Sequence, residues 1–121
     1  MHSRYIIIGI ALLLFASCGR QQQAKSIVKD FMEQHLHQDV SYLDFSDVDS
    51  TQTIGDSLIQ VLHQRAGKNI AYQQRTGQTL FYIRAKYLSE KDTLSTTFYL
   101  DRDLHGVVAF KENDLPSLIN P

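Results

Sequence analysis

The feature that most constrains this chain is an apolar run near its N-terminus, from Tyr5 to Ala16. A short segment with one fixed positive charge, Arg4, precedes it. The run has about twelve residues, whereas a membrane-spanning helix needs roughly 20, because each residue adds only about 1.5 Å to a hydrocarbon core about 30 Å thick. Its length and its charged lead are typical of the apolar region of a secretory signal peptide. We therefore expect the folded part of the protein to begin after this run.

Small residues and the only cysteine of the chain follow the run, in the order Phe15-Ala16-Ser17-Cys18. This tetrapeptide resembles the lipobox of bacterial lipoprotein precursors, Leu-Ala-Gly/Ser-Cys, from which Phe15 departs at the first position. The resemblance implies a signal peptide over residues 1–17 and a diacylglycerol on the thiol of Cys18, which becomes the first mature residue. Two acyl chains or more hold a protein firmly at a bilayer. Two alternatives remain open, namely an ordinary secretory signal that leaves a free thiol and an uncleaved anchor at the membrane surface.

The residues after Cys18 bear on location. In the sorting rule of many Gram-negative lipoproteins, Asp directly after the cysteine retains the protein at the inner membrane, but Gly19 stands here and no acidic run follows. The resemblance therefore implies a lipid-anchored protein of the outer membrane that faces the periplasm. We expect residues 18–24 to be the lipidated cysteine and a short linker that reaches at most ~20 Å.

Composition limits the remaining chain to a single domain. Removing residues 1–17 from the 121 leaves 104 residues, which is enough for one hydrophobic core. The chain has 12 basic and 13 acidic side chains, and loss of Arg4 with the signal leaves a net charge of about −2. That balance argues against nucleic-acid binding. With Cys18 lipidated, no thiol is left for a disulfide, a nucleophile or a zinc site.

Two helices are predicted in the first half of the domain, which we place at residues 25–121. An apolar stripe at helical spacing predicts a helix from Lys25 to about His37; it consists of Ile27, Val28, Phe31, Met32 and Leu36. A second helix is expected from Thr53, which has capping-box spacing to Asp56, to Gly67. Its expected buried stripe is Ile54, Leu58, Val61 and Leu62.

Alternating apolar and polar residues predict three antiparallel strands in the second half, at Thr79–Ser89, Leu94–Leu100 and Val107–Lys111. Residues 39–51 form a polar connector that could add a short edge strand, and Ile70–Tyr72 could pair briefly. We therefore expect an α+β fold, with two helices covering the apolar face of a three- to four-stranded meander. This order resembles that of small uncharacterised bacterial lipoproteins and, distantly, cystatin-like and NTF2-like folds.

The segment from Asp101 to Glu112 shares several positions with an EF-hand calcium loop. Against calcium, His105 supplies a nitrogen at an oxygen position, and the flanking residues alternate like strands where an EF-hand needs helices. A hairpin turn is the simpler interpretation. His35 and His37 would diverge on a helix, and His63 and His105 have no visible partner in the sequence. We therefore expect no metal site and no cofactor.

The polar face of the predicted meander is the best candidate for binding. Tyr82, Arg84, Lys86, Thr97 and Tyr99 should lie together on it. Aromatic rings beside cations suit a glycan, a peptide or an anionic partner, although a solvated outer face has the same composition. No catalytic motif is present. The sequence thus predicts a membrane-anchored, non-enzymatic binding or accessory module for an envelope protein or glycan; the alternatives are a small carboxylate-dependent hydrolase and a calcium-responsive module.

Overall fold

The computed structural model describes residues 19–36, 39–67, 69–90 and 92–112. The predicted signal peptide, Cys18, His37 and the tail from Asn113 onward lie outside these ranges. Residues 19–30 are α-helical and continue directly into a π-helical turn. The elements that follow are η1 (Phe31–His35), β1 (Ser41–Phe45), β2 (Asp49–Thr51), α2 (Asp56–Ala66), β3 (Leu80–Ser89), β4 (Asp92–Leu100) and β5 (Val107–Glu112).

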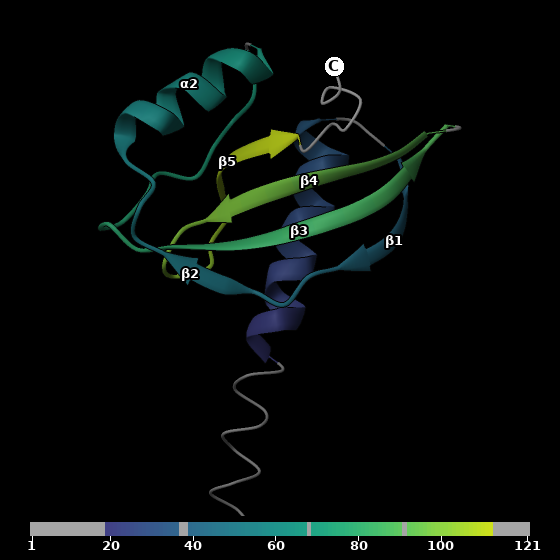
Figure 1. The fold of residues 1–121 in the computed structure, drawn as a ribbon, viewed down its shortest axis with the longest axis horizontal. Coiled ribbons are helices and arrows are strands. Elements are labelled where there is room, and N and C mark those ends of the chain that lie inside the picture. Colours follow the sequence, from purple (N-terminus) through teal and green to yellow (C-terminus); the bar gives the residue numbers. More distant parts are fainter. Residues whose placement is uncertain (1–18, 37–38, 68, 91, 113–121) are drawn as a thin grey trace, which may run out of the picture.

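The strands form one antiparallel sheet around the long strand β3 (Figure 1). Its order is β1-β3-β4-β5, and β2 also pairs with β3. The β3–β4 hairpin runs from the Phe81–Leu100 pair to the Ser89–Asp92 pair without a break in register. The predicted α+β fold and its terminal meander are confirmed. The connector contributes two short strands rather than one, while residues 70–72 have no strand structure.

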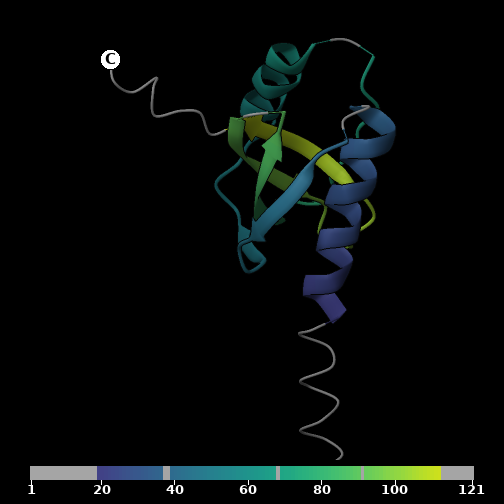
Figure 2. The ribbon, with the colours of Figure 1, turned by 90° about the vertical axis from the view of Figure 1, so that its right-hand side faces the viewer.

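The N-terminal helix, residues 19–30 with η1, packs on one face of the sheet and crosses the strands (Figures 1 and 2). Val28, Phe31 and Met32 of its predicted stripe are buried, as expected. They pack in the main core with alternate residues of the meander, including Ile83, Ala85, Tyr87, Phe98 and Phe110. Phe31 meets the rings of Phe98 and Phe110 edge-on. The alternation in the strands and the helical stripe thus converge on the same core.

The expected linker over residues 19–24 is wrong, because these residues are already helical and Ala24 is fully buried. Gln21 accepts a hydrogen bond from the backbone of Val48 at 2.8 Å and donates one to the carbonyl of Ser46 at 3.0 Å. Gln23 donates to the carbonyl of Leu104 at 3.1 Å. A glutamine-rich segment looks like a linker because the residues are polar, but here two of the side chains satisfy backbone groups of distant loops.

The two helices do not share one face of the sheet, contrary to expectation. The second cluster of buried residues contains Ile59 and Leu62 of α2 with Leu80, Val108 and Ala109 of the sheet. Leu80 alternates with the core-facing residues of β3, so α2 packs on the opposite face, at the end nearest β5 (Figure 2). The presumed polar face therefore carries a small core of its own.

The start and the buried side of α2 also differ from the prediction. The helix begins at Asp56 after Gly55, and the hydroxyl of Thr53 contacts that of Thr51 rather than capping the helix. Ile59 is 8% exposed, whereas Leu58 and Val61 are each 41% exposed. The apolar residues 58, 59, 61 and 62 extend around more than one side of the helix, so their spacing alone did not decide which side is buried.

Candidate functional site

The predicted binding face is assembled by the register of β3 and β4. Tyr82 lies directly opposite Tyr99, and Arg84 lies opposite Thr97, so four of the five predicted residues form two neighbouring cross-strand pairs. The rings of Tyr82 and Tyr99 are 6.4 Å apart between centroids and tilted by 51°. Lys86 follows on the same face, since side chains alternate along a strand. The structure thus brings all five residues together.

A third cation lies on this face, which the sequence analysis missed. Lys111 of β5 is paired with Thr97, in the row that also contains Arg84. Lys111 directly follows the core-facing Phe110, so the alternation of side chains along β5 places it on the opposite face, in regular register with Thr97. Arg84, Lys86 and Lys111 are exposed, and no ion pair joins any of them to another residue of the described ranges.

The aromatic end of the face is partly covered. Tyr99 packs against the cluster beneath α2, and Thr97 is only 7% exposed. Burial raises the pKa of the Tyr99 phenol, the neighbouring Tyr82 raises it further, and the positive charge of Arg84 opposes both effects. The accessible part of the face therefore consists of two half-buried tyrosine rings beside exposed cations.

Acidic residues lie along the other edge of the same face. Asp44 of β1 is paired with Lys86, and Asp49 of β2 is paired with Tyr82. Both aspartates are exposed. The face is thus divided, with cations over β3 and β5 and carboxylates at the β1–β2 edge, and an anionic ligand is favoured only over the first part.

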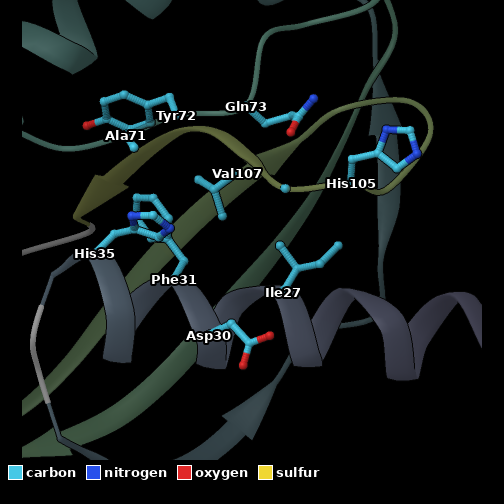
Figure 3. Close-up of a pocket in the computed structure, with 10 residues that line it drawn as sticks. Ile27, Asp30, Phe31, His35, Ala71, Tyr72, Gln73, His105 and Val107 are labelled. Carbon is cyan, nitrogen blue, oxygen red and sulfur yellow. The ribbon is translucent and has the colours of Figure 1, made fainter.

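A groove of about 290 Å³ lies between the N-terminal helix and the segments around residues 71–73 and 105–107. Figure 3 shows Ile27 and Val107 near its middle, Phe31 and His35 toward one end and His105 at the other. Among the described residues that line it, Asp30 has the only carboxylate. Acid–base hydrolysis of the glycosidase type uses two convergent carboxylates. The groove therefore offers no support for the carboxylate-dependent hydrolase.

The loop between β4 and β5 is organised by Asp101, which is completely buried. Its Oδ1 accepts hydrogen bonds from the backbone amides of His105, at 2.7 Å, and Gly106, at 2.9 Å. The amide of Leu104, whose φ is +55°, donates to the Asp101 carbonyl at 3.0 Å. The hairpin turn expected for this segment is therefore present, and a buried carboxylate holds it.

The EF-hand interpretation of this segment fails on geometry. Strands β4 and β5 flank the loop, where an EF-hand has helices. Glu112, the expected last ligand, lies at the far end of β5 opposite Thr96. Asp101, Asp103 and His105 do lie together, with their potential ligand atoms within 4.8 Å of one another. The first three potential ligands of the EF-hand pattern thus form a cluster, and Glu112 is not part of it.

His63 and His105, which have no partner visible in the sequence, both have one in the structure. His63 stacks on Tyr72 and lies with Nε2 2.6 Å from the carbonyl oxygen of Val108. His105 Nδ1 lies 3.5 Å from Asp101 Oδ2. The contacts of His63 join residues 9 or more apart in the chain, so spacing in the sequence gave no signal for them. The contact of His105 depends on the loop conformation, and in the sequence it was visible only as part of a misleading calcium pattern.

Comparison of the chain with models of protein families, with curated proteins and with solved structures finds no match. Within the part of the chain that the structure describes, no helix has the length and apolar character needed to cross a membrane. The functional argument therefore rests on the geometry of the residues above.

Proposed function

We propose that this protein is a lipid-anchored, non-enzymatic binding module of the bacterial outer membrane, facing the periplasm, and that its β3–β5 face binds a carboxylate-bearing glycan of the envelope. The observation that carries the ligand class is the Tyr82–Tyr99 pair beside Arg84, with Lys86 and Lys111 next to them. Tyrosine rings offer flat apolar surface to sugar rings, and the cations offer charge to carboxylates.

The anchoring part of the proposal rests on the resemblance of Phe15-Ala16-Ser17-Cys18 to a lipobox. The helical structure of residue 19 sharpens it, because the domain then starts directly after the lipidated residue. With a rise of about 1.5 Å per residue, the first fully buried side chain of the helix, Ala24, lies only about 8 Å along it from Gly19. A domain held this close would have little freedom to turn away from the bilayer.

Intact mass and membrane fractionation of the native protein test the anchor. The expected mass is that of residues 18–121 plus acyl chains, found in the outer-membrane fraction. Cys18→Ala should leave an uncleaved precursor or a released domain. A wild-type protein with a bare soluble mass would contradict the lipid anchor, and so would a Cys18→Ala variant that is still acylated.

A titration of the full chain in detergent with oligogalacturonate, followed by NMR, tests the ligand class. We expect the largest amide shifts on β3 and β4, and at least about tenfold weaker binding by Tyr82→Ala or Arg84→Gln, because each removes one principal contact. A neutral oligosaccharide of equal length should bind more weakly. Asp92→Asn, at the far exposed end of β4, is the matched control.

Two outcomes would redirect the proposal, and a third would overturn it. Shifts confined to the groove beside the N-terminal helix would move the site away from β3–β5. Binding of an acidic peptide but of no acidic glycan would favour an envelope protein as the partner. If Tyr82→Ala and Arg84→Gln bound the glycan as the wild type does, the β3–β5 face would have no part in recognition.

A further inference from the structure

The β4–β5 loop gathers three side chains that ligate metal ions. Asp101, Asp103 and His105 alternate along the loop and turn their carboxylates and imidazole toward one another, with one potential ligand atom from each within 4.8 Å of the others. Asp103 and His105 are exposed, whereas Asp101 is buried. Proximity of such groups on a surface loop is common, so the argument depends on what Asp101 does.

Asp101 presents a buried oxygen that accepts no hydrogen bond from the described residues. Its Oδ1 is fully used by the two backbone amides that close the loop. The residue is 0% exposed, so water does not reach its Oδ2, and this oxygen accepts no hydrogen bond from any residue of the described ranges. A buried carboxylate oxygen without a partner is costly, because its desolvation is not compensated. A cation at Oδ2 would remove that cost.

The neighbour of Oδ2 is placed as a co-ligand rather than as a hydrogen-bond donor. Nδ1 of His105 lies 3.5 Å away. An N–H···O hydrogen bond needs about 2.7–3.2 Å. Two ligands on a tetrahedral ion with bonds of about 2.0–2.1 Å are separated by roughly 3.4 Å. The observed separation thus matches the edge of a tetrahedral site.

We propose that Asp101 Oδ2, a carboxylate oxygen of Asp103 and His105 Nδ1 bind a divalent transition-metal ion of the zinc class. Two oxygens and an imidazole nitrogen suit zinc, whereas calcium takes six to eight oxygens and magnesium also prefers oxygen. Three protein ligands leave the fourth position to water or to an incoming group. His105 also lines one end of the groove, so the ion would lie at that end (Figure 3).

The surroundings of Asp103 are compatible with this role. Thr76 donates a hydrogen bond to Asp103 Oδ2 at 3.3 Å, which leaves Oδ1 for the ion. Arg102 Nε is 4.0 Å from Oδ1, and both side chains are largely exposed. The Arg102 contact is weak because solvent screens exposed ion pairs, so a doubly charged ion can replace it.

Calorimetric titration of the full chain with zinc chloride tests the site. The protein should be untagged and kept in detergent, and it should carry Cys18→Ala throughout, because tags and thiols bind zinc themselves. We expect one ion per chain with a Kd of about 10 μM or lower, and at least about a hundredfold weaker binding of calcium. Cobalt should give the absorption bands of a tetrahedral site.

Variants at exposed positions separate ligation from folding. Asp103→Asn and His105→Ala should each weaken zinc binding at least about tenfold, since loss of a residue that merely orients a ligand already costs that much. His35→Ala and Asp49→Asn, which are also exposed, should bind as before. Asp101→Asn keeps an acceptor for the loop amides, and its circular dichroism will show whether the fold is retained.

Absence of saturable zinc binding below about 1 mM would overturn the proposal. Unchanged affinity in His105→Ala would also overturn it, because the zinc would then be held by other histidines. Because Tyr82 and Arg84 are not ligands, their variants should bind zinc normally, so failure of the glycan proposal and failure of this one are distinguishable.

Discussion

The imidazole of His63 lies flat on the ring of Tyr72, with centroids 3.8 Å apart and planes 12° from parallel. The same imidazole lies with Nε2 2.6 Å from the carbonyl oxygen of Val108. A carbonyl only accepts, so Nε2 carries the proton. The side chain of His63 on α2 thus contacts both Tyr72, in the segment that leads to β3, and Val108 of β5.

Replacement of His63 should separate these two contacts. His63→Phe keeps an aromatic ring on Tyr72 but removes the donor to Val108, so we expect the free energy of unfolding to fall by about 1–3 kcal/mol. His63→Ala should lose roughly 1 kcal/mol more with the stack. Urea unfolding measures both, with Gln64→Ala on the exposed side of α2 as the control. Equal stability of His63→Phe and wild type would show that the hydrogen bond contributes nothing.

Tyr72 offers the opposite test, since its hydroxyl is buried and has no hydrogen-bond partner among the described residues. Tyr72→Phe removes that hydroxyl and keeps the ring that packs on His63 and Phe31. We expect the variant to be as stable as the wild type or more stable by up to about 1–2 kcal/mol. A loss above about 1 kcal/mol in thermal unfolding would mean that the hydroxyl has a partner after all.

Arg75 connects the start of α2 to the loop before β3, and its side chain is only 16% exposed. Its guanidinium donates to the carbonyls of Ile54 at 2.7 Å, Gly77 at 2.8 Å and Gln78 at 2.9 Å. Arg75→Lys keeps the charge but cannot reach three carbonyls in these directions. We expect both Arg75→Lys and Arg75→Ala to lose about 2–4 kcal/mol in urea unfolding. If Arg75→Lys were as stable as the wild type, charge alone would explain the role of Arg75. The control is Arg65→Lys, at an exposed position on α2.

The parts of the fold that follow from local pattern were predicted well. Alternation identifies β3 and β4 because apolar residues of the main core, such as Ile83 and Phe98, recur at every second position, and the stripe with Phe31 identifies the N-terminal helix. What failed depends on contacts between distant residues. The helical state of residues 19–24 reflects the bonds of Gln21 and Gln23 to loops that follow much later in the chain.

The candidate sites show the same division. Tyr82, Arg84, Lys86, Thr97 and Tyr99 could be grouped from the sequence because a tight hairpin joins β3 and β4 in regular register. Lys111 was missed because its position beside Arg84 depends on the pairing of β5 with β4 across a longer loop, which alternation within β5 does not give. The cluster of Asp101 with His105 was visible only as part of a calcium pattern, since burial of the carboxylate depends on the folded loop.

The buried side of α2 can be tested with two neighbouring aliphatic residues. Ile59 packs against Leu80 and Val108 in the second cluster, whereas Val61 is largely exposed. Ile59→Ala should lower the free energy of unfolding by about 2–4 kcal/mol, and Val61→Ala by less than about 1 kcal/mol. Guanidinium denaturation measures both losses. Similar losses at the two positions would mean that α2 is rotated relative to the structure or that Val61 is covered by another part of the protein.

The titration of Tyr99 reports directly on the proposed binding face. Burial raises the pKa of Tyr99, and the positive charge of Arg84 lowers it because that charge stabilises the phenolate. Arg84→Gln should therefore raise the Tyr99 pKa above its wild-type value, while Arg102→Gln, which removes a cation that does not contribute to the Tyr99 shift, should leave it unchanged. Ultraviolet difference absorbance against pH, with Tyr99→Phe to assign the signal, measures the shift.

The raised pKa also gives an alkaline limit to stability. Tyr42, Tyr72 and Tyr99 all have pKa values above the ordinary 10.0, each chiefly through burial. The folded state then holds their protons more firmly than the unfolded state, so the free energy of unfolding should fall as the pH rises from about 10. Tyr99→Phe should flatten part of that decline in urea unfolding between about pH 9 and 11. A decline of equal steepness in the variant would show that Tyr99 ionises as freely as an exposed tyrosine, and the two rings of the face would then be open to solvent.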